Sequence, residues 1–156
     1  IDPPRVREPE EVAKGKPIVG GGVRFRGRAA DKLIEGLPLT SNANFRECPD
    51  EDLVSPGRVH IDGEGNVQLC QGISIGNVWQ VPLWEILASY DPETHPVCGP
   101  LLRGGPAELA KEYGLDGEES PLDSSHVDGC HLCYTTRQTL RGRLPDCLLP
   151  DQAYGE

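Results

Sequence analysis

Four cysteines in this chain have residue types and spacing that suit metal binding. Cys48 stands alone, Gly65-x4-Cys70 follows it, and Cys130-x2-Cys133 lies much farther along. A gap of two residues lets both sulfurs of the last pair converge on one centre. Thiolates, commonly four of them, hold Fe–S clusters, and four thiolates also hold zinc in tetrahedral sites. The sequence therefore predicts a metal centre on Cys48, Cys70, Cys130 and Cys133, made of iron or of zinc.

The two other cysteines have different expected roles. Cys98 lies in a stretch rich in proline and glycine, where we expect a small buried side chain rather than a ligand. Cys147 is open to either packing or ligation. Disulfides would need an oxidising compartment, and no feature of the sequence indicates export. Zinc bound purely for folding is the main alternative to an iron–sulfur cluster.

Composition favours a small fold that depends on such a centre. The 156 residues include 19 Gly and 15 Pro but only two Phe and two Trp, so turns are many and the apolar core is thin. Folds of this kind usually need disulfides or a metal as a staple. A net charge of −10 argues against a nucleic-acid partner. No apolar run approaches the ~20 residues that cross a bilayer, so we expect no membrane segment.

The best-defined expected element is a β-hairpin that carries Cys70. Residues 58–62 and 67–70 alternate apolar and polar side chains, and residues 63–66 between them supply turn chemistry. In the register that we expect, His60 and Cys70 share one face of the hairpin, and the apolar side chains lie on the other.

Apolar periodicity and the positions of Gly and Pro predict the other elements. We expect a short strand at 23–26 and helices at 29–37, 82–90, 106–113 and 130–144. We also expect a linker at 1–22 and loops at 95–106 and 117–128.

Several side chains near these elements are predicted to have structural or solvent-facing roles. We expect Trp79 and Trp84 to lie in the core or at a domain interface, and His131 to lie at the surface. On the last helix we expect three arginines, Arg137, Arg141 and Arg143, to form a solvated face or to pair with some of the many carboxylates.

Together these elements predict an α+β fold. It is a small, cysteine-rich, loop-rich domain, in which a β-hairpin and short helices surround a metal cluster. We expect it to span 45–156, with 1–44 a linker or the remnant of a preceding domain. The chain contains no Met and starts at Ile1, so we expect it to be a piece of a longer protein. Without a sign of export, we expect a cytoplasmic location.

The arrangement of cysteines resembles a known family. Gly65-x4-Cys70 after Cys48, a short helix and then Cys130-x2-Cys133 are similar to the SPASM domain of radical SAM enzymes, or to its shortened twitch form. The resemblance covers about residues 45–147. It implies that the four cysteines ligate one auxiliary [4Fe–4S] cluster.

This sequence also departs from the family pattern. Only Cys147 follows Cys133, whereas the full SPASM pattern has enough cysteines there for a second cluster, so the one-cluster twitch form is favoured. The gap after Cys48 is also slightly longer than usual. Cys130, Cys133 and Cys147 together resemble the three-cysteine cluster of the molybdenum-cofactor cyclase, which leaves a trio as the alternative ligand set. We prefer the quartet because it also accounts for the hairpin.

The resemblance implies a role within a larger enzyme. The C-x3-C-x2-C motif that holds the SAM-cleaving cluster is absent from this chain, so the radical would be generated by a preceding radical SAM barrel. The auxiliary cluster would position or oxidise a substrate, for which a peptide is one candidate. The alternative function is that of a zinc-stabilised structural or binding module without a redox role.

Overall fold

The computed structural model describes residues 23–48, 50–117 and 119–155. Its helices are α2 (Arg28–Lys32), α3 (Leu83–Ser89), α4 (Cys98–Glu112) and α5 (Gly129–Leu140). Its strands are β1 (Thr40–Ser41), β2 (His60–Ile61), β3 (Asn66–Cys70), β4 (Ile73–Asn77) and β5 (Ser125–His126). Two short 3-10 helices, η1 (Asn42–Asn44) and η2 (Asp151–Tyr154), complete the described elements. The described part is therefore α+β, as predicted.

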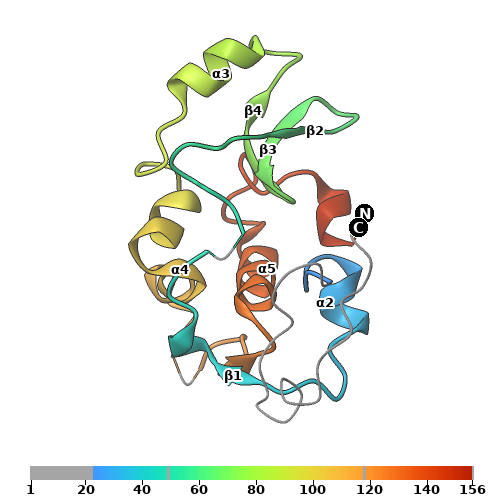
Figure 1. Cartoon of the computed structure of the whole chain (residues 1–156), viewed down its shortest axis with the longest axis vertical. Coiled ribbons are helices and arrows are strands. Elements are labelled where there is room, and N and C mark those ends of the chain that lie inside the picture. Colours follow the sequence, from blue (N-terminus) through green and yellow to red (C-terminus); the bar gives the residue numbers. More distant parts are fainter. Residues whose placement is uncertain (1–22, 49, 118, 156) are drawn as a thin grey trace.

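Helix α5 is the central element (Figure 1). Helices α4 and α2 lie on either side of it, the sheet β2–β3–β4 with α3 lies beyond one end, and the ladder of β1 and β5 lies at the other end. Since neighbours surround α5, most of its side chains are buried, including Leu132, Tyr134 and Leu140. None of the described helices is long and apolar enough to cross a membrane.

The hairpin of β2 and β3 forms in the expected register, and β4 adds a third antiparallel strand. His60 pairs with Gln68 and Ile61 with Val67. Asp62 organises the turn, because its carboxylate accepts hydrogen bonds from the backbone N–H groups of Glu64 (2.9 Å) and Asn66 (3.0 Å). The side-chain amides of Asn66 (3.0 Å) and Gln68 (2.9 Å) donate to its other oxygen. Burial alone would raise the pKa of Asp62, but these hydrogen bonds, the one from the Asn66 side chain first, keep it below its usual value.

Gly65 is required at the end of this turn for two reasons. Its φ is +82°, in the left-handed region that favours glycine, and a Cβ there would lie 2.9 Å from Asn77 Oδ1 and 3.0 Å from the Trp79 ring. The glycine of the Gly65-x4-Cys70 motif therefore lets the chain pack closely against the end of β4 and the residue Trp79 as it enters β3.

Helix α4 is two helical segments joined at a kink. Gly104 and Gly105 have non-helical backbone angles, and Pro106 opens the second segment. At Gly105, where φ is +65°, the chain just before Cys48 packs directly on the backbone, and Ala107 N donates a hydrogen bond of 3.0 Å to Phe45 O. The kink therefore positions the loop that carries Cys48.

Several expected boundaries are wrong. Residues 23–26 form no strand, because Phe25 turns into the core while Arg24 and Arg26 point toward different partners. The helix expected at 29–37 ends at Lys32. The loop expected at 95–106 contains the first segment of α4, and the loop expected at 117–128 contains β5, which pairs with β1. The expected linker at 1–22 lies outside the described residues.

The predictions for single side chains have mixed outcomes. Cys98 is fully buried, as predicted. Trp79 and Trp84 are 73% and 70% exposed, so neither lies in the core. The predictions for His131 and Arg137 are wrong, since they are 7% and 1% exposed. His131 is buried because its ring packs edge-on against that of His126, with centroids 4.7 Å apart.

Candidate metal centre

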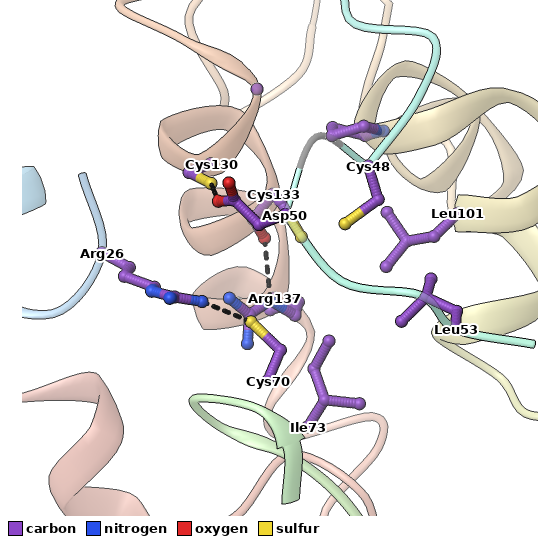
Figure 2. A pocket seen from close by; sticks show the side chains of 12 residues that line it. Arg26, Cys48, Asp50, Leu53, Cys70, Ile73, Leu101, Cys130, Cys133 and Arg137 are labelled. Carbon is purple, nitrogen blue, oxygen red and sulfur yellow. Dashed lines mark hydrogen bonds between the residues drawn. The ribbon is translucent and has the colours of Figure 1, made fainter. Parts of the chain in front are cut away.

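One cavity lies between α5, the end of β3, the first segment of α4 and the loop after η1 (Figure 2). Its volume is about 20 Å³. Four of the residues that line it come from α5: Gly129, Cys130, Cys133 and Arg137. The others come from earlier parts of the chain: Arg26, Cys48, Asp50, Leu53, Cys70, Ile73, Leu101 and Pro106.

All four cysteines predicted as ligands line this cavity, although they lie far apart in the sequence. Figure 2 shows Cys48 on the loop beside α4, Cys70 at the end of the hairpin, and Cys130 and Cys133 on α5. Cys98 and Cys147 are not among its lining residues. The four cysteines of the predicted quartet therefore line one cavity, whereas Cys147 of the alternative trio does not line it. Their ligation of a metal stays a prediction.

Helix α5 presents two of these cysteines and one arginine on the same face. Cys130, Cys133 and Arg137 are separated by three and four residues, the spacing at which side chains align along a helix. Asp128 caps the helix by accepting a hydrogen bond of 2.7 Å from His131 N. Cys130 lies in the first turn of the helix, beside the positive end of its dipole.

The cysteines stand as free thiols in a poorly solvated environment. None of the six, all of which are described, forms a disulfide. Burial raises the pKa of Cys48 and of Cys130, and it raises the pKa of Cys133 to about 11. Cys130 Sγ donates a hydrogen bond of 2.8 Å to Asp50 Oδ2. A metal would have to displace these thiol protons, since thiolates are the ligand form.

Asp50 is a buried carboxylate within this cavity. Its side chain is 7% exposed and forms an ion pair of 2.8 Å with Arg24. The same carboxylate accepts the hydrogen bond from Cys130. Asp50 is only two residues after Cys48, so its nearness to a predicted ligand in the sequence could have indicated that it lies at the site.

Two cationic side chains also line the cavity. Arg26 Nη1 donates a hydrogen bond of 2.6 Å to Cys70 Sγ. Arg137 is fully buried, and although burial alone would lower its pKa, nearby Cys133 and Tyr154 raise it above the usual value. Arg137 therefore stays charged inside the protein. Arg137 comes four residues after Cys133, a spacing that predicts the same helix face as the cysteines.

The side chains as they stand are not gathered tightly around one point. In the described part of the chain, no three side chains of His, Cys, Asp or Glu are arranged to hold a metal ion. Four thiolates about 2.3 Å from one zinc ion would lie roughly 3.8 Å from one another. Any metal at this site therefore requires the lining side chains to adjust.

No protein family, curated protein or solved structure matches this chain. The likeness to SPASM and twitch domains therefore depends on the cysteine motifs alone.

Proposed function

We propose that Cys48, Cys70, Cys130 and Cys133 hold one [4Fe–4S] cluster. We further propose that this chain is the auxiliary-cluster module of a radical SAM enzyme, in which the cluster positions or oxidises a substrate. The observation that most supports the ligand set is that four thiols from three separate regions line one cavity. The donor set matches the cluster chemically, because four cysteine thiolates are its commonest ligands.

The charges around the cavity support an anionic occupant. A buried cation costs free energy unless an anion offsets its charge. Arg137 is 1% exposed, and the described residues place no carboxylate in an ion pair with it. A metal centre with four thiolates has a net negative charge, so it would offset Arg137 where neutral thiols do not.

Cys98 supplies a matched control for the proposed ligand Cys133. Cys98 is buried beside the same core but does not line the cavity. Replacing Cys133 with Ser removes a proposed ligand, whereas Cys98→Ser makes the same chemical change at a packing position. A loss of the metal in the first variant alone would therefore identify a ligand rather than a general weakening of the core.

Binding of the cluster would require the lining side chains to move. The cavity of about 20 Å³ has room for little more than one water molecule, so binding has to move the lining side chains apart. Part of the folding free energy would then come from the metal, and the metal-free protein should be less stable. When bound by four cysteines, the cluster would supply one-electron redox chemistry.

The test is anaerobic purification and reconstitution with iron and sulfide. We expect a brown protein that holds about four irons and four sulfides per chain. Cys133→Ser should lose the cluster and Cys98→Ser should retain it. A colourless protein that binds one zinc ion and no sulfide would instead support the structural zinc module. Equal loss of iron in both variants would contradict the ligand assignment.

The radical SAM assignment needs a separate test, because the SAM-cleaving motif is absent from these residues. On this proposal, the whole enzyme carries C-x3-C-x2-C ahead of this segment and converts SAM to 5′-deoxyadenosine under reducing conditions. A longer protein that holds the auxiliary cluster but cannot cleave SAM would remove the enzyme class and leave the cluster site intact.

A further inference from the structure

Arg137 makes only neutral contacts although it is buried. Its Nε donates a hydrogen bond of 3.2 Å to the backbone carbonyl of Cys133. Its Nη1 donates to Gln71 O at 2.7 Å and to the hydroxyl of Tyr154 at 3.1 Å. The described residues place no carboxylate within ion-pair distance, so the positive charge of Arg137 is not cancelled locally.

Arg26 reaches the same cavity from a different part of the chain, and its side chain points to Cys70 (Figure 2). It lies on the segment before α2, and its Nη1 is 2.6 Å from the sulfur of Cys70. No ion pair of the described residues includes Arg26. Two positive charges therefore face the proposed ligands, and Arg26 is in direct contact with the sulfur of Cys70. Among the described residues that line the cavity, the one carboxylate, Asp50, contacts Cys130 and is paired with Arg24.

We propose that Arg137 and Arg26 raise the reduction potential of the cluster, and so make it an electron acceptor. This inference rests on the proposed function, since it requires a cluster on the four cysteines. Reduction adds one electron, and a positive charge in a poorly solvated site stabilises the reduced form. A hydrogen bond to a ligand sulfur acts in the same direction, because it withdraws electron density from the cluster.

The two arginines would act in different ways. Arg26 contacts a ligand sulfur, so its effect combines charge with a hydrogen bond. The hydrogen bonds of Arg137 described above go to carbonyls and a hydroxyl, so its effect on the cluster is that of its charge. Arg137 also ties α5 to the hairpin end and to η2, and this structural role has to be separated from the electrostatic one.

A pair of substitutions at Arg137 makes that separation. Arg137→Met removes the charge and keeps a long side chain in the space. Arg137→Lys keeps the charge but cannot reproduce the planar set of hydrogen bonds. Arg143→Gln is the matched control, because Arg143 is an exposed arginine shortly after the same helix and does not line the cavity.

The experiment is a redox titration of the reconstituted chain with dithionite, in which the reduced cluster is followed by EPR. At a fixed potential, we expect Arg137→Met and Arg26→Gln each to lower the ratio of reduced to oxidised cluster at least ten-fold, which is 59 mV for one electron. Arg137→Lys should stay within about three-fold of the original protein, or roughly 28 mV by the same constant. Arg143→Gln should leave the potential unchanged.

Several outcomes of this titration would overturn the proposal. Equal potentials in the original protein, Arg137→Met and Arg26→Gln, all with full iron, would overturn the proposal. Equal shifts in Arg137→Met and Arg137→Lys would show that hydrogen-bonded structure, not charge, sets the potential, and would overturn it as well. If Arg137→Met cannot hold the cluster, Arg26→Gln decides alone. An original protein that takes up no iron and sulfide would refute the proposed function before any variant is compared.

Discussion

The kink at Gly105 is the most direct link between the fold and the proposed metal centre. Substitution of Gly105 by Ala would place a Cβ 2.2 Å from the backbone nitrogen of Glu47. Ordinary van der Waals contact begins at 3.4 Å, so this nitrogen would have to move by the difference, 3.4 − 2.2, or 1.2 Å. Cys48 is the next residue along the chain. A metal ligand tolerates errors of about 0.2 Å, so we expect metal binding by Cys48 to fail.

The cost in stability has three contributions. A left-handed backbone costs a non-glycine residue about 1–2 kcal/mol. Overpacking costs about 1–3 kcal/mol, and loss of the hydrogen bond from Ala107 N to Phe45 O costs about 0.5–1.5 kcal/mol. We therefore expect Gly105→Ala to lower the free energy of unfolding by roughly 2.5–6.5 kcal/mol.

Gly114 provides the matched control for this substitution. It ends the helical segment that starts just after Gly105, and its φ of +72° is also left-handed, but a Cβ added there would meet no atom within 4 Å. Gly114→Ala should therefore cost only about 1–2 kcal/mol and leave the metal content unchanged. Urea unfolding and iron analysis of both variants make the comparison. The reasoning is refuted if both variants lose the same stability and bind the same amount of iron.

Two further predictions concern buried polar side chains. Tyr154→Phe should destabilise the protein by about 1–3 kcal/mol in urea unfolding, because the Tyr154 hydroxyl donates a hydrogen bond of 2.7 Å to Gly72 O and accepts one from Arg137. Tyr134→Phe is the control and should cost little, since the buried Tyr134 hydroxyl has no hydrogen-bond partner among the described residues. Burial lowers the pKa of His126 to about 4 in the folded protein. As the pH falls below about 6.5, His126 is therefore protonated in the unfolded chain but remains neutral in the folded one. The stability that depends on neutral His126 should be complete above that pH and should decline toward pH 4. Urea unfolding at pH 7.5 and at pH 5.0 should show this loss of stability. The loss between the two pH values should be smaller in His126→Gln, and it should be unchanged in His60→Gln, where the replaced side chain is exposed.

Local sequence patterns predict those parts of the fold that are determined by near neighbours. The register of the hairpin follows from alternation and from the turn at Asp62, and His60 pairs with Gln68 as expected. The helix at 106–113 follows from the proline that opens it. In contrast, β1 and β5 pair Thr40 with His126, and nothing local to either segment specifies such a distant partner.

The candidate site, like the fold, can be predicted from the sequence only in part. Cysteine spacing predicts the four thiols that line the cavity, but residue type alone assigns the arginines to solvent, because arginine is usually exposed. Arg137 lies instead on the face of α5 that carries Cys130 and Cys133, a place that helical spacing in the sequence is enough to indicate. Arg26 cannot be found in this way, since only the tertiary packing of the segment before α2 brings it to Cys70.

The charge of the cavity differs in sign from that of the chain. The protein carries a net charge of −10, yet the charged side chains that line the cavity are two arginines and one carboxylate, Arg26, Arg137 and Asp50. Within the described residues, Asp50 forms its ion pair with Arg24 and not with either of these arginines. In water, the excess of surface carboxylates is screened beyond about 10 Å at moderate salt, whereas charges inside the protein are screened much less. The electrostatic potential at Cys70 and Cys133 is therefore governed by Arg26 and Arg137 rather than by the net charge. A site of this kind favours an anionic occupant and stabilises any electron added to it.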